Sequence, residues 1–378
     1  MNKKKIPMVD LYAQYQSIRA SVDKNIGMVI KESAFVGGRF VEQFEAEFAS
    51  YCHSKYAVAL NSGTDALFLS LWALGIKAGD EVITSPFSFF ATAEVICRLG
   101  AKPVFADIDP RSFNINPDSI KQIITRKTKA IIPVHIFGRP AEMLKIKKLA
   151  KKYGLAVVED ACQAVGAKYN NHLIGSIGDV GCFSFFPSKN LGAYGDSGAI
   201  VTDNDELANK IRKLRNHGSL VKYQNESIGV SSRLDGIQAA VLLAKLPYLN
   251  KWNQRRRIIA REYTRLLGDC EEILTPKWDV DRTYSVYHQY TILVKGNCRD
   301  GLKEHLSKNG VSTMVYYPTP LHMLVALKDR GYKSGSLPVV EKVCREVLSL
   351  PIYPELGFEN IAKIARLVKS FVMNNRTR

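Results

Sequence analysis

The stretch FSFFPSKNLGAYGDSGA (183–199) contains a single cation, Lys189, between an aromatic run and a glycine-rich run. Most lysines lie on solvated faces, so a structural or solubilising role is the simplest interpretation of this one. Its neighbours favour another interpretation. A lysine in apolar surroundings has its charged form disfavoured, and the free amine is a nucleophile that can form a Schiff base. We therefore take Lys189 as a candidate catalytic residue.

Short β-rich runs lead up to this stretch and are separated by helical patterns. The predicted strands are EVITSP (81–86), KPVFADI (102–108), KAIIPV (129–134), LAVVEDA (155–161) and GCFSFF (181–186), with AIVTDN (199–204) as an antiparallel candidate. The predicted helices are ALFLSLWALG (66–75), ATAEVICRLG (91–100), PDSIKQIIT (117–125) and AEMLKIKKLAKKYG (141–154). Apolar strands that alternate with helices predict an α/β fold with a mostly parallel sheet covered on both faces.

The pattern of predicted elements changes after residue 234. A single long helical stretch is predicted over 236–267, followed by the strand YHQYTILV (287–294), a helix near LKEHLSK (302–308) and two final helices. With 378 residues, the chain can form one large and one smaller domain. We expect a large domain over 1–250, with the N-terminal segment included, and a small α+β domain over 251–378 with a linking helix.

Composition argues against several classes of protein. No run is apolar enough to span a membrane, and MNKKKIPMVD lacks the apolar segment of a signal peptide, so we expect a cytoplasmic protein. The seven cysteines are scattered and form no CxxC pair, which argues against a disulfide framework or a zinc ribbon.

The net charge of +17 raises nucleic-acid binding as an alternative. The charge is diffuse, however, and its densest runs, KIKKLAKK (145–152) and RRR (255–257), lack the interleaved aromatic residues of a base-stacking surface. A basic chain also suits a small polyanionic substrate such as a nucleotide diphosphate.

Polar residues stand where predicted strands end, which is where open α/β sheets bind ligands. NSGTDAL places Ser62, Gly63 and Thr64 at the start of a helix, where free N–H groups and hydroxyls suit a phosphate; an ordinary turn with an N-cap is the alternative. Asp160 ends another strand, and Gln163 follows it. Its carboxylate could ligate a metal, cap a helix or pair with a ring nitrogen, but no second carboxylate or histidine stands at metal-ligand spacing.

One cofactor requires a phosphate cradle, a strand-end carboxylate and a lysine in an apolar pocket. Pyridoxal 5′-phosphate (PLP) carries a phosphate, a pyridine nitrogen that must stay protonated, and an aldehyde that reacts with a lysine amine. Phe89 in PFSFFAT is our candidate for stacking on the ring. The sequence therefore predicts a PLP enzyme without a metal.

Five motifs, NSGTDAL, PFSFFAT, EDACQAVGA, SFFPSKNLGAYGDSGA and SRLDGIQAA, resemble those of the DegT/StrS family of nucleotide-sugar aminotransferases, which have fold type I of PLP enzymes. The resemblance covers residues 9 to 322. It implies a seven-stranded sheet and a homodimer with shared active sites. It implies that Lys189 forms the Schiff base and shuttles the proton, and that Asp160 pairs with the pyridine nitrogen. The other implied cofactor contacts are Gln163 near the ring and Ser184, Gly63 and Thr64 at the phosphate.

Two positions depart from the family pattern. Ser231 stands where the family usually has an asparagine that reaches the phosphate from the partner subunit, and Ser197 turns the customary GDGG into GDSG. Ser231 can still donate one hydrogen bond, over a shorter reach. Lys189 argues against a related sugar dehydratase, in which histidine replaces the lysine. GAYGDSG and VGGRF do not form the GxGxxG of a dinucleotide enzyme.

The segment MVYYPTPLH (314–322) resembles members that aminate a 3-keto nucleotide sugar, with Tyr316 where histidine is common. We predict transamination from L-glutamate to a UDP-linked 2-acetamido-3-keto hexose or hexuronate, for lipopolysaccharide, O-antigen or lipid A synthesis. A 4-aminotransferase of 4-keto-6-deoxy sugars is the alternative, and a PLP-binding regulator or nucleic-acid-binding protein is the non-enzyme alternative.

The candidate substrate contacts are Arg233, Tyr316, Tyr317 and His322. The guanidinium fork of Arg233 can bind a carboxylate of glutamate or of a uronate through two parallel hydrogen bonds. Alternatively, Arg233 forms a salt bridge with Asp235 or another neighbour.

Overall fold

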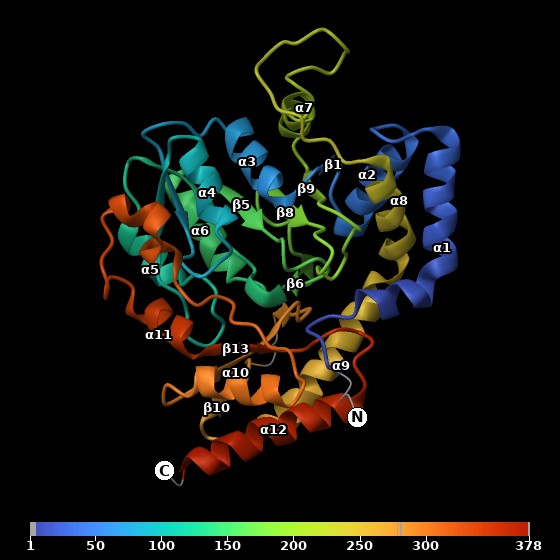
Figure 1. Ribbon diagram of the computed structural model, residues 1–378. Coiled ribbons are helices and arrows are strands. Elements are labelled where there is room, and N and C mark those ends of the chain that lie inside the picture. The colour runs from blue at the N-terminus through green and yellow to red at the C-terminus, as the bar shows by residue number, and fades with distance from the viewer. Residues whose placement is uncertain (1–4, 278, 280–281, 377–378) are drawn as a thin grey trace.

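A seven-stranded sheet forms the centre of the larger part of the protein in the computed structural model, which describes residues 5–277, 279 and 282–376 (Figure 1). The strand order is β1-β9-β8-β5-β4-β2-β3. The strands are β1 (Tyr56–Leu60), β2 (Glu81–Thr84), β3 (Lys102–Phe105), β4 (Thr128–Ile132), β5 (Ala156–Asp160), β8 (Val180–Ser184) and β9 (Gly198–Thr202). Among these seven strands, β9 alone runs opposite in direction to the other six. The mostly parallel sheet and its antiparallel strand near residue 200 are therefore confirmed.

β1 is the strand that the sequence patterns did not reveal. Its residues YAVAL include two alanines, which are weak strand formers, so the run lacks the β-branched density of the other strands. Pairing with β9 along all five residues stabilises it in the folded protein.

Helices cover both faces of this sheet. One face carries α3 (Gly63–Ala73), α4 (Ala91–Arg98) and α7 (Asp205–Leu214). The other carries α2 (Arg39–Cys52), α5 (Pro117–Ile123), α6 (Met143–Tyr153) and α8 (Gly236–Lys245), and α1 (Leu11–Glu32) packs on α8. Successive residues of a strand enter opposite clusters: Val58 packs with the first set of helices, whereas Ala57 and Ala59 pack with the second.

The single long helix predicted over 236–267 is wrong. α8 ends at Lys245, a 3-10 turn spans Leu246–Tyr248, and α9 covers Leu249–Leu267. Pro247 lies in this turn and has no backbone N–H to continue the hydrogen-bond ladder of α8, which explains the break.

A smaller part follows, built on the antiparallel sheet β10 (Ile273–Leu274), β12 (Tyr290–Val294) and β13 (Val347–Leu350). Apolar residues of α9, α10 (Arg299–Lys308) and α12 (Phe358–Arg376) share one cluster with this sheet. α11 (Pro338–Glu346) precedes β13, and short 3-10 turns span Leu321–Met323 and Val325–Arg330; a further 3-10 turn, Ile136–Gly138, lies in the larger part between β4 and α6. This arrangement confirms the expected α+β character.

The two parts are in close contact. A third sheet pairs β11 (Thr283–Tyr284) with the hairpin of β6 (Lys168–Tyr169) and β7 (His172–Leu173). The N-terminal segment also reaches the smaller part, because Ile6 pairs with Val311. The division at residue 250 lies in the first turn of α9 and stays a prediction. None of the described helices has the length and apolar character needed to cross a membrane.

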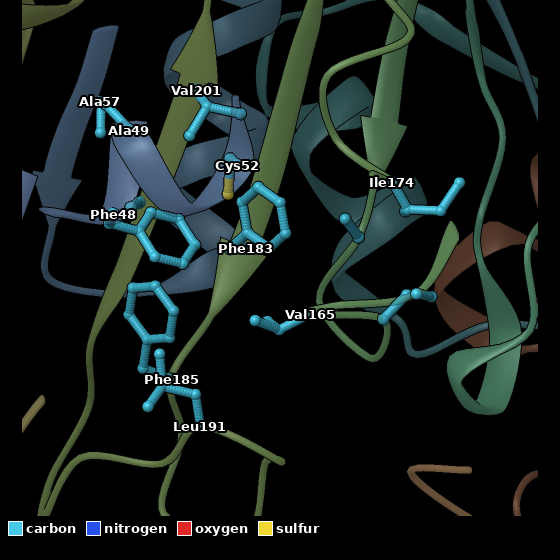
Figure 2. Close-up of a cluster of buried hydrophobic side chains, with 14 of the residues drawn as sticks. Phe48, Ala49, Cys52, Ala57, Val165, Ile174, Phe183, Phe185, Leu191 and Val201 are labelled. Atoms are coloured by element: carbon cyan, nitrogen blue, oxygen red, sulfur yellow. The ribbon is translucent and has the colours of Figure 1, made fainter. Parts of the chain in front are cut away.

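Aromatic packing anchors β8, the strand that leads to Lys189. The ring of Phe48 from α2 lies 5.1 Å from those of both Phe183 and Phe185, with interplanar angles of 89° and 90° (Figure 2). Edge-to-face contacts of this kind stabilise a core beyond the burial of apolar area. The cluster thereby holds the end of β8 in place.

Phe185→Ala should therefore lower the free energy of unfolding by about 3–5 kcal/mol, because it leaves a cavity in this cluster. Phe186→Ala is the matched control, because the neighbouring Phe186 is 50% exposed; it should change stability by only about 0.5 kcal/mol. Urea unfolding followed by circular dichroism measures both. Equal losses in the two variants would contradict the packing described.

Candidate active site

A cavity of about 610 Å³ lies at the carboxyl edge of the large sheet. Its walls come from the start of α3, the start of α4, the ends of β5 and β8, and the segments 288–289 and 315–317 of the smaller part. The structure brings these residues predicted from the sequence to its surface: Gly63, Thr64, Phe89, Asp160, Gln163, Ser184, Lys189, Tyr316 and Tyr317.

Lys189 lies in the loop that follows β8, and its backbone N–H donates a hydrogen bond to the carbonyl of Phe186 at 2.8 Å. Burial lowers the pKa of its ammonium group, and the nearby Asp160 carboxylate offsets part of this effect. Its amine is therefore closer to the neutral, nucleophilic form than that of a surface lysine. Among the described residues that line the cavity, Lys189 is the only cation.

The first turn of α3 and the end of β8 approach each other closely. A Cβ atom on Gly63 would lie 2.6 Å from the Cβ of Ser184 and 2.9 Å from the Sγ of Cys162, so this position requires glycine. The hydroxyl of Ser62 accepts a hydrogen bond from the N–H of Asp65 at 3.1 Å and caps the helix. The N-cap interpretation thus holds, and the helix N-terminus still faces the cavity with its positive dipole end, which suits an anion.

Asp160 ends β5 and is only 6% exposed. Its Oδ2 accepts a hydrogen bond from the Thr92 hydroxyl at 2.8 Å, and its Oδ1 accepts one from the N–H of Cys162 at 3.2 Å. Two donors satisfy a buried carboxylate in its anionic form. In the part of the chain that the structure describes, no three histidine, cysteine or acidic side chains gather as a metal site requires.

Gln163 connects the large sheet to the smaller part. Its Oε1 accepts a hydrogen bond from the N–H of Phe137 at 2.8 Å, and its Nε2 donates one to the Tyr317 hydroxyl at 3.2 Å. Burial raises the pKa of both Tyr316 and Tyr317, so these phenols stay protonated at neutral pH. Phe89 is 60% exposed, which leaves a ring face open to a ligand.

Ser231 and Arg233 do not line the cavity. Both are exposed at the base of the loop 216–231, which projects beyond α7 (Figure 1). The guanidinium of Arg233 donates hydrogen bonds to Asn216 Oδ1 at 3.3 Å and to Ser231 Oγ at 3.1 Å. Within the described ranges it forms no salt bridge, neither with Asp235 nor with another neighbour.

His322 also lies away from the cavity, and this placement does not support it as a substrate contact. The residue is 1% exposed, and its Nε2 lies 3.2 Å from Glu341 Oε1. Its ring packs near those of Phe105 and Tyr332. The imidazole is enclosed by neighbouring side chains, so a ligand in the cavity cannot reach it.

Several cavity residues were not predicted from the sequence. Those with polar side chains or a thiol are Ser88, Thr92, Cys162, Ser188, Asp196, His288 and Gln289. Ser88, Thr92 and Cys162 stand inside the motifs PFSFFAT and EDACQAVGA, so those motifs carried a signal for them. His288 carried none, since a lone histidine before an apolar strand is indistinguishable from a core residue.

Hydrogen bonds determine which ring nitrogen of His288 carries the proton. The carboxamide of Asn190 donates through Nδ2 to Asn253 Oδ1 at 2.8 Å and to the Val286 carbonyl at 3.1 Å. Asn253 in turn donates through Nδ2 to the Val165 carbonyl at 2.9 Å. Asn190 Oδ1 is therefore an acceptor, and His288 Nδ1 donates to it at 3.2 Å. In the neutral ring, Nε2 is then unprotonated.

Residues 16–369 match the DegT/DnrJ/EryC1/StrS aminotransferase family. The chain belongs to this family. It is an enzyme, a PLP-dependent sugar aminotransferase, and its fold is type I of the PLP enzymes.

Several relatives resemble this aminotransferase over almost its whole length. The "pleiotropic regulatory protein" of Geobacillus stearothermophilus is 47% identical, with 97% of this chain and 99% of the relative covered. The UDP-N-acetyl-3-dehydro-alpha-D-glucosamine 3-aminotransferase of Acidithiobacillus ferrooxidans is 44% identical over 96% and 97% of the two chains. The dTDP-3-amino-3,4,6-trideoxy-alpha-D-glucose transaminase of Streptomyces venezuelae is 43% identical over 97% and 96%.

A solved structure agrees closely with the fold. DesV of Streptomyces venezuelae, in complex with a ketimine intermediate, superposes with a TM-score of 0.95, 41% identity, and coverage of 98% of this chain and 99% of DesV.

The residues of the cavity fit PLP. An α-helix N-terminus beside the Ser184 hydroxyl suits the phosphate, the buried anion of Asp160 suits a protonated pyridine nitrogen, and the Lys189 amine suits the aldehyde. The glycine at position 63 leaves the helix N-terminus close to Ser184 and Cys162, where a Cβ atom would collide with both.

His288 should make the stability of this aminotransferase dependent on pH. Burial, with smaller contributions from Lys189 and Arg256, lowers the pKa of His288 well below its ordinary value. As the pH falls below about 6.5, the unfolded chain takes up a proton at this residue that the folded protein excludes, so stability falls. Between pH 7.5 and pH 5 the free energy of unfolding should fall less in His288→Gln than in the wild type. Below about pH 6.5, the difference between the two should grow by up to about 1.4 kcal/mol per pH unit.

Urea unfolding at several pH values measures this difference. His172→Gln, which removes an exposed imidazole, is the matched control. Parallel pH profiles for the wild type and His288→Gln would show that His288 binds a proton equally well in the folded and unfolded states, which would contradict a lowered pKa.

Proposed function

We propose that this aminotransferase transfers the amino group of L-glutamate to C3 of a UDP-linked 2-acetamido-3-keto sugar. One observation carries this proposal: Tyr316 and Tyr317 of the segment YYPTPLH line the cavity that contains Lys189. The names of two relatives support amination at C3, although one of them takes a UDP sugar and the other a dTDP sugar. Amination of a 4-keto-6-deoxy sugar is the alternative.

Lys189 is the proposed catalytic residue. Its Nζ would hold PLP through the aldehyde carbon, with the aldehyde oxygen lost as water, and the free amine would move a proton to or from the substrate carbon. The lowered pKa of Lys189 favours both roles, because a neutral amine is required for attack and for accepting a proton. When bound, PLP supplies an electron sink for charge that develops at the reacting carbon.

The other cavity residues hold and orient the cofactor in this proposal. The carboxylate of Asp160 would keep the proton on the pyridine nitrogen, and Phe89 and Gln163 would contact the ring. Gly63, Thr64 and Ser184 bind the phosphate through N–H and hydroxyl groups. Their positions around one cavity support these roles.

A second copy of the chain is proposed to complete the site. A diphosphate and a carboxylate require cations, but Lys189 is the only one among the described cavity residues. The projecting loop 216–231 carries strongly exposed apolar residues: Leu220, Val221, Tyr223 and Ile228. In a homodimer this loop would be covered by the partner and could bring Ser231 and Arg233 to the partner's cavity. Arg233 has no acidic partner within the described residues, so its fork is available to a substrate carboxylate.

The choice of acceptor also bears on pathway and location. A UDP-linked 3-amino sugar would serve lipopolysaccharide, O-antigen or lipid A synthesis, and a cytoplasmic site of action suits a nucleotide-sugar substrate. Both stay predictions. The regulatory name of one relative belongs to that protein, and a purely regulatory role would not require a lysine with a lowered pKa beside a buried carboxylate.

Purified protein should be yellow, and borohydride should attach PLP irreversibly to the peptide that contains Lys189. Lys189→Ala should retain PLP only non-covalently, because no other cation lines the cavity in the described residues. Peptide mass spectrometry after reduction locates the label. Lys245→Met is the control, since it removes a buried lysine that donates to the Gly192 carbonyl, outside the cavity. A label on any other lysine would refute the assignment.

The acceptor can be identified by incubating the amine-loaded enzyme with a panel of 3-keto and 4-keto nucleotide sugars and analysing the products by NMR. We expect 3-amino products from UDP-2-acetamido-3-keto sugars. The uronate should be converted slightly faster than the neutral sugar. Arg233→Ala should selectively lose activity with the uronate acceptor and retain the half-reaction with glutamate. Loss of both would assign Arg233 to the donor, and turnover of 4-keto-6-deoxy sugars alone would refute amination at C3.

A further inference from the structure

A chain of three buried side chains ends on the carboxylate of Asp160. The hydroxyl groups of Ser88 and Thr92 lie 2.8 Å apart, and that of Thr92 lies 2.8 Å from Asp160 Oδ2. Ser88, Thr92 and Asp160 are 3%, 1% and 6% exposed. Thr92 lies in the first turn of α4, whereas Asp160 ends β5, so the chain links two separate elements of the large domain.

The direction of these hydrogen bonds follows from the chemistry of the groups. An ionised carboxylate can only accept, so the single hydroxyl proton of Thr92 points to Asp160. Thr92 Oγ1 can then only accept from Ser88, which settles the direction of the second bond. The sequence of donors is therefore Ser88 to Thr92 to Asp160, and polarisation along such a chain strengthens its terminal, charge-assisted bond.

Both oxygens of Asp160 are held in this way. The N–H of Cys162 binds Oδ1, and the Thr92 hydroxyl binds Oδ2. The backbone donor belongs to the turn that follows Asp160 itself and moves with it. Thr92 is the donor from another element, and its β-branched side chain has few rotamers. It therefore fixes the rotation of the carboxylate relative to the wall of the cavity.

We propose that Thr92 is a positioning residue, which orients the Asp160 carboxylate and stabilises its anion through the chain from Ser88. The proposal rests on the role of Asp160 at the pyridine nitrogen given above. Thr92 acts through Asp160: with the hydroxyl in place, the carboxylate keeps one orientation and one charge, and the pyridine nitrogen keeps its proton.

Thr92→Val tests this directly, because valine keeps the shape of threonine and removes the hydroxyl. Each variant is loaded with PLP labelled with 15N in the ring, and the 15N chemical shift reports protonation of the pyridine nitrogen. In Thr92→Val we expect the signal to move toward the unprotonated form and the single-turnover half-reaction with L-glutamate to slow about tenfold to a hundredfold, as loss of a hydrogen bond to a charged group predicts. Thr92→Ser retains the hydroxyl and should keep the wild-type ring signal.

Thr202→Val is the matched control. Thr202 is also a buried threonine, 3% exposed, and its hydroxyl donates to the Asp179 carbonyl at 2.7 Å, but it ends β9 and does not line the cavity. This variant should leave the ring signal unchanged. Ser88→Ala removes the first donor and should shift the ring signal in the same direction as Thr92→Val, by a smaller amount.

Asp160→Asn distinguishes failure of the role proposed for Asp160 from failure of the role proposed for Thr92. If Asp160→Asn leaves the ring signal unchanged, the role of Asp160 itself is wrong. If Asp160→Asn moves the signal and Thr92→Val keeps both the wild-type signal and the wild-type rate, the positioning role of Thr92 is overturned. Should Thr92→Val fail to fold, Ser88→Ala decides: a shifted signal supports the chain, and a wild-type signal overturns it.

Discussion

The parallel pairing of β5 with β8 is the interaction on which the rest of the site depends. Asp160 pairs with Cys182 in this register, so the carboxylate at the end of one strand lies beside the strand that leads to Lys189. Parallel neighbours end at the same edge of a sheet, and both groups therefore face one cavity. A slip of one residue would turn Asp160 to the opposite face and abolish the site.

The residue before Asp160 shows why that register is stable. Glu159 points to the other face, where it is completely buried and accepts hydrogen bonds from His135 and from the N–H groups of Gly175, Ile177 and Gly178. His135 Nδ1 accepts from the N–H of Ala141, so its Nε2 is the donor. Burial alone would raise the pKa of Glu159, but these donors hold it below its ordinary value. Unpaired, such a charge would strongly destabilise the fold, so the network holds β5 in its register.

The smaller part completes the cavity and sets its chemical character. Tyr317 contacts Gln163, and His288 contacts Asn190, the residue next to Lys189. Both contacts place polar groups that stay neutral close to the lysine, since burial keeps the Tyr317 phenol protonated and the His288 ring uncharged. The cavity wall thus combines the Lys189 amine, the buried Asp160 carboxylate, the exposed Asp196 side chain and several neutral donors and acceptors.

The α/β class, the mostly parallel sheet and the PLP cofactor could be predicted from the sequence, because strand and helix periods are local properties of the chain and the motifs around Lys189 and Asp160 are contiguous. The sequence did not reveal β1, whose alanine-rich run depends on pairing with β9. Nor did it reveal the contact between Thr92 and Asp160, 68 residues apart, or the burial of His322 away from the cavity. These features depend on which distant segments pack together, and that packing follows from the burial of the whole chain.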